Sequence, residues 1–164
     1  MRLVTSREHS LFKKLRRLQQ VSRQRHDEGK TLLDGVHLLQ SCLAAGNIPE
    51  LLIVSESGYR RAEVSQLLDR MTEVYGKIDC LLLSDALFNQ LSPVKTPVGV
   101  MALIRIPRYI QPSDFRENSF CILLETVQDP GNLGSILRSA AAAGVQNVFL
   151  SAGCVDGWSP KVLR

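Results

Sequence analysis

The segment ETVQDPGNLGSILRSAAAAGVQNVFLSAGCVDGWSPKVLR, residues 125–164, decides the fold of the carboxyl-terminal part of the chain. It follows the apolar run FCILL at residues 120–124, which predicts a buried strand. The segment then predicts, in order, a loop over residues 129–132, a helix over residues 133–143 with Asn132 as its N-cap and Gly144 at its end, a strand over residues 148–150, and a helix that begins at Ser159-Pro160. Strand, helix and strand in this order form a right-handed βαβ unit with parallel strands.

The predicted loop has the properties of an anion-binding site. It lies where a strand ends and a helix begins, and ligands bind at that edge of open α/β sheets because backbone N–H groups and the helix dipole face them. Gly131 and Gly134 allow close approach of the backbone. Arg138 follows Gly134 by one helical turn, so its guanidinium can reach back over this glycine and hold a phosphate through two hydrogen bonds. The glycine spacing matches neither a Walker loop nor a dinucleotide fingerprint. A helix start with structural glycines and a surface arginine is the plain alternative.

Upstream, residues 1–106 predict a smaller α/β domain of their own. A capping-box pattern at residues 5–8, with Leu11, Leu15 and Leu18 on one face, predicts an amino-terminal helix. The other predicted elements are a helix over residues 31–45, a strand over 50–54, a helix over 60–75, a strand over 80–83, a helix over 85–91 and a strand over 99–106. Residues 107–118 contain two prolines and no periodicity, which indicates a linker.

Positive charge is concentrated near the amino terminus. The net charge is +4, but residues 1–30 contain nine Lys or Arg against three Asp or Glu, a balance of +6, and residues 31–164 contain eleven against thirteen, a balance of −2. A basic arm on a nearly neutral body favours a polyanionic partner. Because acidic residues are nearly absent between Glu8 and Asp27, the amino-terminal helix, with Arg25 in its last part, is expected to face RNA or DNA; a solvated helix face is the alternative. With 5% aromatic residues, contacts to phosphate and ribose are expected rather than base stacking. The candidate contacts are Arg7, Lys13, Lys14, Arg16 and Arg17.

The sequence also argues against several other classes of protein. No apolar run approaches the roughly 18 residues that span a bilayer, and the start MRLVTSREHS lacks the apolar core of a secretory signal. The four cysteines form no CxxC pair and the histidines lie far from the later ones, so no metal site is expected. A reduced, cytoplasmic protein is the expectation.

Two groups of motifs carry a resemblance to a known family. The segments DPGNLGSILRSAAAAGV, LSAGCVD and SPKVLR resemble the first sequence motif of the SpoU (TrmH) family of RNA ribose methyltransferases, in the SPOUT superfamily. Upstream, TSREHSLFKKLRRL and LSPVKTPVGVMALI resemble the beginning and end of that family's small RNA-binding domain. The fold class implied is α/β: a small amino-terminal RNA-binding domain at residues 1–106, the linker at 107–118, and the first βαβ part of a knotted SPOUT methyltransferase domain at 119–164.

The resemblance implies methyl transfer from S-adenosylmethionine to a ribose 2′-hydroxyl of RNA by a homodimeric protein. The family's functional asparagine and arginine stand six residues apart, as Asn132 and Arg138 do, so these are the expected catalytic residues, and Arg138 and Gly134 are expected to contact RNA. An arginine is a poor base because its pKa exceeds about 12. Arg138 is therefore expected to bind the adjacent phosphate and to orient the hydroxyl. Glu125 and Asp129 are weaker candidates for a base, and a plain capping role for Asn132 stays open.

Part of the family pattern is absent from these 164 residues. The second and third motifs, which supply most of the cofactor pocket and the knot, have no counterpart, so the cofactor-binding residues are expected beyond Arg164 in a longer protein. The basic additional domain favours ribosomal over transfer RNA. Two other functions stay open: a non-catalytic RNA-binding module without the cofactor site, and a nucleotide-binding enzyme that uses the loop at residues 129–134.

Overall fold

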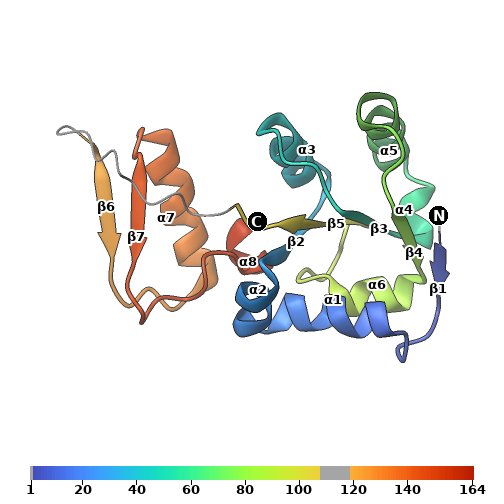
Figure 1. The fold of residues 1–164 in the computed structure, drawn as a ribbon, viewed down its shortest axis with the longest axis horizontal. Coiled ribbons are helices and arrows are strands. Elements are labelled where there is room, and N and C mark those ends of the chain that lie inside the picture. The colour runs from blue at the N-terminus through green and yellow to red at the C-terminus, as the bar shows by residue number, and fades with distance from the viewer. Residues whose placement is uncertain (1, 108–118) are drawn as a thin grey trace.

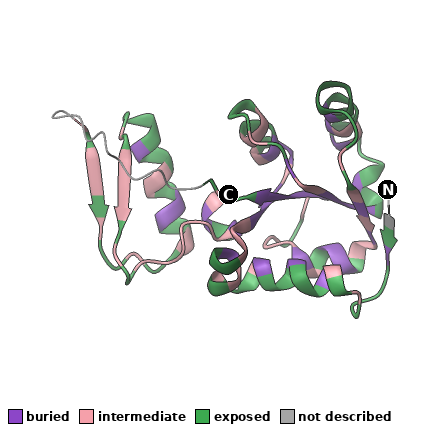
Figure 2. Cartoon of the chain, viewed as in Figure 1, coloured by how far each residue is buried: buried purple, intermediate pink, exposed green. Residues whose placement is uncertain are grey.

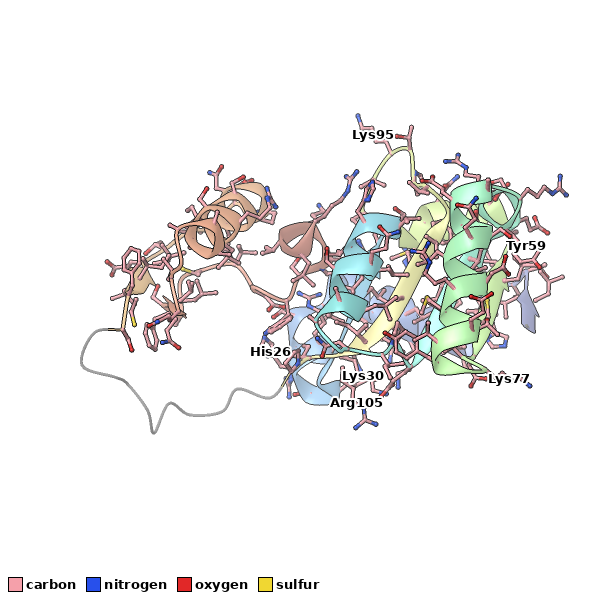
Figure 3. The ribbon with its side chains drawn as sticks, turned by 90° about the horizontal axis from the view of Figure 1, so that it is seen from above. His26, Lys30, Tyr59, Lys77, Lys95 and Arg105 are labelled. Atoms are coloured by element: carbon pink, nitrogen blue, oxygen red, sulfur yellow. The ribbon has the colours of Figure 1, made fainter. Side chains whose placement is uncertain are left out.

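The computed structural model describes residues 2–107 and 119–164, which form two bodies side by side (Figure 1). The larger body contains a five-stranded sheet in the order β1-β4-β3-β5-β2. Its strands are β1 (Arg2–Val4), β2 (Lys30–Asp34), β3 (Leu51–Ser55), β4 (Cys80–Leu83) and β5 (Val100–Arg105). Strand β4 pairs in parallel with β1 and β3, whereas β5 pairs antiparallel with β3 and β2. Lys30 and Arg105 therefore lie at one end of the strands, and the loop with Lys95 lies at the other (Figure 3).

Helices cover both faces of this sheet (Figure 1). Helices α1 (Ser10–Gln20), α2 (Ser22–Glu28) and α6 (Asp85–Leu91) lie on one side, and α3 (Val36–Ala44) and α5 (Ala62–Tyr75) lie on the other; the short α4 (Glu56–Tyr59) follows β3. Figure 2 shows the sheet buried between these layers. The first core contains Phe12, Leu15 and Phe88, which are at most 1% exposed, and the second contains Leu39 and Val64. Full burial of one such side chain contributes about 1.5–3 kcal/mol, so the apolar faces of α1 and α5 hold these helices on the sheet.

The smaller body contains one βαβ unit. Strands β6 (Cys121–Leu124) and β7 (Asn147–Leu150) pair in parallel, and α7 (Pro130–Ala142) connects them. This arrangement confirms the strand-helix-strand order that the sequence predicts. Neither strand contains a buried residue, and Leu123 is 73% exposed. A last short helix, α8 (Pro160–Leu163), contacts both α7 and β2, so it lies between the two bodies.

The prediction of one helix over residues 31–45 is wrong. Residues 30–34 form β2, and α3 begins only at Val36. The run Thr31-Leu32-Leu33 is buried on both faces, and a short continuous apolar run fits a buried strand as well as a helix. The signal for a strand is the pair of flanking glycines: Gly29 and Gly35 have φ of 62° and 101°, a backbone that favours glycine and ends regular structure on both sides.

The amino-terminal helix also differs from its prediction. The chain begins with the unpredicted strand β1, and α1 starts at Ser10 with His9 as its N-cap, whose side chain accepts a hydrogen bond from the N–H of Leu11. The capping-box pattern at residues 5–8 therefore does not cap the helix. Val21, in an extended conformation, separates α1 from α2. The other predicted elements of this body occur within two residues of their predicted ends, and the predicted linker at 107–118 lies outside the described residues except for Pro107.

Candidate active site

The loop before α7 is ordered by Asp129. Its Oδ1 accepts a hydrogen bond of 2.8 Å from the N–H of Asn132, and Pro130 is the first helical residue. The predicted N-cap, Asn132, is therefore wrong: the cap is Asp129, because proline suits the first helical position and places its predecessor at the cap. The side chain of Asn132 is not needed to cap the helix, and the residue is exposed on its first turn.

Arg138 reaches back over Gly134 as the helical spacing predicts. A Cβ atom added to Gly134 would lie 3.3 Å from Nη1 of Arg138. The exposed guanidinium donates one hydrogen bond of 3.2 Å from Nη2 to Oγ of Ser135. A guanidinium has five N–H donors, so further donors of the exposed Arg138 can bind a phosphate or carboxylate oxygen pair.

Gly134 also provides the contact that seats α8. The same added Cβ would lie 2.5 Å from the carbonyl oxygen of Val162, a distance that real Cβ atoms essentially never show. Gly134 is buried and Val162 is 2% exposed. Helices α7 and α8 can approach each other this closely because glycine has no side chain. The RNA contact expected at Gly134 stays a prediction, and its backbone would have to make that contact.

The loop that follows β6 is held by the segment that follows β7. Thr126 has φ of 57°, which is a strained conformation for a β-branched residue, and its N–H donates to Oγ of Ser151 at 3.2 Å. The N–H of Val155 donates to the carbonyl oxygen of Val127 at 2.8 Å. Residues 151–155 thus fix the loop through these two hydrogen bonds. Glu125 is exposed in this loop.

A buried ion pair, which the sequence does not reveal, lies beside the loop. Arg25 is 3% exposed, and its Nη2 lies 2.6 Å from Oδ2 of Asp156. The expectation that Arg25 belongs to an RNA-facing surface is therefore wrong. Burial alone would raise the pKa of the Asp156 carboxyl, but hydrogen bonds from the Trp158 N–H and from Arg25 outweigh it and hold this pKa below its ordinary value.

The cations of α1 are exposed, but two of them have acidic partners. Lys13 pairs with Glu8, and Nζ of Lys14 lies 2.6 Å from Glu28. The expectation of a helix without acidic partners thus fails, because Glu28 folds back from α2 and Glu8 from the preceding loop. Arg16 and Arg17 are exposed and take part in none of the ion pairs recorded for residues 2–107 and 119–164, and Arg7 is exposed before α1.

A cleft connects the end of α1 to the start of α7. Its volume is about 620 Å³, and its lining includes Gln19 and Gln20 of α1, Pro130 of α7, and Ser159 and Lys161 at the start of α8. A larger groove of about 670 Å³ lies between α3 and α5, away from the loop. Within the described ranges, no three acidic, histidine or cysteine side chains gather to hold a metal ion, and no helix is long and apolar enough to cross a membrane.

Comparisons with known proteins match both bodies. Residues 10–102 match the MRM3-like substrate binding domain, and residues 119–164 match the SpoU rRNA Methylase family. Human mitochondrial rRNA methyltransferase 3 is 35% identical over 145 residues, which cover 85% of this chain and 33% of that protein. An uncharacterized tRNA/rRNA methyltransferase of Synechocystis is 36% identical over 161 residues, which cover 98% of this chain and 57% of that protein.

Solved structures agree with these matches. The crystal structure of an RNA 2′-O ribose methyltransferase has 33% sequence identity and a TM-score of 0.75, and the match covers 99% of this chain and 60% of that one. An AdoMet-bound rRNA methyltransferase from Sinorhizobium meliloti, at 24% identity, has a TM-score of 0.77 with 99% and 59% coverage and thus shares the fold. The two bodies together have the fold of the parts of these RNA methylases that they match, about three fifths of each. The chain belongs to the SpoU rRNA methylase family. It spans between a third and three fifths of the length of these proteins.

Proposed function

We propose that this chain is the RNA-recognition part and the first catalytic part of an RNA methyltransferase that transfers a methyl group from S-adenosylmethionine to a ribose 2′-hydroxyl. Residues 1–106 bind the substrate and residues 119–164 begin the catalytic domain, with 107–118 as the linker. The observation that carries the proposal is the guanidinium of Arg138 above Gly134 at the amino end of α7. The name of the solved relative with 33% identity, an RNA 2′-O ribose methyltransferase, supports the same reaction.

In this proposal Arg138 acts by position and charge. Its exposed guanidinium binds the phosphate next to the target ribose and holds the 2′-hydroxyl in the orientation for attack, because two parallel hydrogen bonds fix a phosphate better than one. It does not take the hydroxyl proton, since arginine stays protonated. Asn132, exposed on the first turn and not needed for capping, is the second catalytic residue.

The methyl group comes from S-adenosylmethionine, for which we assign no binding residue among those described. The cleft nearest to the loop has the volume for a small molecule, but its lining is mostly polar and joins α1 to the segment before α8. An adenosine group requires an apolar, enclosed pocket with a few polar contacts, and this cleft does not fit it.

The substrate proposal is ribosomal rather than transfer RNA, bound through the amino-terminal cations. Arg7, Lys13, Lys14, Arg16 and Arg17 are all exposed. Arg16 and Arg17 contribute most, because Lys13 and Lys14 are partly neutralised by Glu8 and Glu28. The proposal also includes a homodimer and a cytoplasmic location. The human relative is named as mitochondrial, so the location needs its own test by fractionation.

The test is the variant Arg138→Ala in the protein as encoded in full. We expect the transfer of radioactive methyl groups to ribosomal RNA to fall by about 100-fold or more, the effect of losing one charge-stabilising donor. The midpoint of thermal unfolding should stay unchanged, because Arg138 is exposed and donates only to Ser135 among the described residues. The matched control is Arg70→Ala, an exposed arginine of α5.

Normal methyl transfer by Arg138→Ala would remove the role assigned to this arginine. If the unaltered protein binds RNA and transfers no methyl group, the non-catalytic RNA-binding module is the better description.

A further inference from the structure

The two bodies are joined by one buried ion pair between residues far apart in the sequence. Nε of Arg25 donates to Oδ2 of Asp156 at 2.7 Å across a separation of 131 residues. The two side chains are 4% and 7% exposed. Arg25 belongs to α2, on the side of the larger body that faces the smaller one, where Figure 3 shows its neighbour His26.

Further hydrogen bonds fix the direction of both side chains. Nη1 of Arg25 donates to the carbonyl oxygen of Leu18 at 2.8 Å, so the guanidinium also binds the end of α1. Asp156 accepts from Oγ of Ser22 at 3.0 Å and from the N–H of Trp158 at 2.9 Å. A buried, charged pair of this kind requires one geometry, because any displacement leaves a charge without a partner in a poorly solvated place.

The segment around Asp156 makes two contacts that hold the candidate active site, one to its loop and one to α7. One residue before Asp156, Val155 binds the loop at Val127; six residues after it, the carbonyl oxygen of Val162 rests on Gly134 below Arg138. The carbonyl oxygen of Trp158 accepts a hydrogen bond of 2.6 Å from Thr31 of β2. Asp156 therefore lies at the centre of a segment that contacts the larger body on one side and the helix of Arg138 on the other.

We propose that Arg25 and Asp156 form a positioning pair that sets the distance and orientation between the RNA-binding helices and Arg138. The inference rests on the proposed function. The bond from Arg25 to the carbonyl of Leu18 ties the end of α1, the helix of Arg16 and Arg17, to Asp156 and through it to α8 and α7. An RNA held by α1 then presents one particular ribose to Arg138, so the pair contributes to the choice of the nucleotide that is methylated.

The test compares Arg25→Met, Asp156→Asn and the double variant, with Arg70→Met as the matched control on the far side of the sheet. Three quantities are measured in the protein as encoded in full: the dissociation constant for ribosomal RNA, kcat for methyl transfer, and the position of the methylated ribose. A fourth is measured on the 164-residue chain: the fluorescence emission of Trp158, the single tryptophan, whose backbone N–H donates to Oδ1 of Asp156.

We expect Arg25→Met to leave RNA affinity unchanged and to lower kcat by about 100-fold, the effect of a displacement of roughly 1 Å at a reacting centre. Methylation that remains should spread to neighbouring nucleotides, and the emission of Trp158 should shift to longer wavelength. Asp156→Asn should do the same, and the double variant should be no worse than either single one, because the two residues act as one unit. Far-UV circular dichroism identifies any variant that fails to fold, and in that case Asp156→Asn, which keeps its shape, carries the test.

Any one of three results would overturn the inference. In the first, a variant with shifted Trp158 emission keeps the kcat and the methylation site of the unaltered protein. In the second, Arg25→Met leaves the Trp158 emission unchanged, and in the third the losses of kcat in the two single variants add in the double variant. Failure of the proposed function gives a different result: the unaltered protein transfers no methyl group. Even then, the emission of Trp158 reports whether Arg25 holds the segment around Asp156 in place.

Discussion

Substitution of Gly134 by alanine tests whether α8 determines the position of α7. The glycine lies inside a 13-residue helix, where alanine normally stabilises by about 1 kcal/mol because it restricts the unfolded chain. Here the added methyl group would lie 2.5 Å from the carbonyl oxygen of Val162, whereas ordinary contact begins at 3.4 Å. The two helices must therefore separate by roughly 0.9 Å, the difference between these distances, with overpacking as the physical cause.

The expected effect is a net loss of stability. Overpacking costs about 1–3 kcal/mol, and the upper end applies because the obstructing atom belongs to the backbone and not to a flexible side chain. After subtraction of the helix gain of about 1 kcal/mol, the free energy of unfolding should fall by about 2 kcal/mol. For a chain of this size that corresponds to a decrease of about 4–8 °C in the unfolding midpoint.

Urea unfolding of the 164-residue chain, followed by the fluorescence of Trp158, measures this change close to the site, because Trp158 lies two residues before the first residue of α8, Pro160. Gly131→Ala in the first turn of the same helix is the control. Its nearest neighbour is Oδ1 of Asp129 at 3.1 Å, a side-chain atom that has to give by only a few tenths of an ångström to reach ordinary contact at 3.4 Å. The hydrogen bond from Asn132 to this oxygen can persist, so the loss should be well below that of Gly134→Ala. If Gly134→Ala raises stability by about 1 kcal/mol, as alanine does in an unobstructed helix, the contact with Val162 does not restrict α7 and the reasoning is refuted.

Two further results are expected. The double variant Arg16→Gln/Arg17→Gln should lower the slope of log affinity for single-stranded RNA against log salt by about 1.4, or 0.7 for each lost phosphate contact, as measured by fluorescence anisotropy at several salt concentrations. Lys13→Gln/Lys14→Gln should lower it less, because these lysines already face Glu8 and Glu28; equal slopes would contradict this difference. The emission of Trp158 should shift as the pH falls below about 4. The pKa of Asp156 is lowered in the folded chain, so the carboxylate stabilises the contact between the two bodies at any pH above its ordinary pKa, and this stabilisation is lost as the pH falls through the pKa of the folded chain. Constant emission through this pH range would contradict the assignment to Asp156.

Local patterns in the sequence predict the geometry of the loop well. The place of Arg138 above Gly134 follows from helical spacing alone, since both residues belong to one helix whose period is known. The helix start is predicted three residues too late, because Asn132 and Asp129 are both good caps and the proline between them decides for Asp129. Such errors concern neighbouring residues, and they do not affect the predicted position of Arg138 above Gly134.

The arrangement of the two bodies is not predictable from the same patterns. Arg25 looks like one more cation of a basic helix, and Asp156 lies in a loop with no periodicity; their contact joins residues 131 positions apart. Strand β2 was missed for a different reason: its apolar run packs against α1 on one face of the sheet and α3 on the other, and such a run fits a helix as well as a strand, although Gly29 and Gly35 mark its ends. The contact between Arg25 and Asp156 has no local signature in a single sequence.

Burial gives two arginines of this chain opposite roles. Arg25 directs its guanidinium at Asp156 and at the carbonyl of Leu18, so its hydrogen bonds are used to fix one arrangement of the two bodies. Arg138 is exposed and, within residues 2–107 and 119–164, makes a single recorded hydrogen bond, of 3.2 Å to Ser135. A guanidinium carries five donors, and those that have no protein partner are the ones that can bind a ligand. For the same reason a lysine at position 25 would lose the bond to Leu18 while keeping the charge, whereas a lysine at position 138 would lose the paired hydrogen bonds to a phosphate. Both substitutions preserve charge, yet the first should alter where methylation occurs and the second whether it occurs.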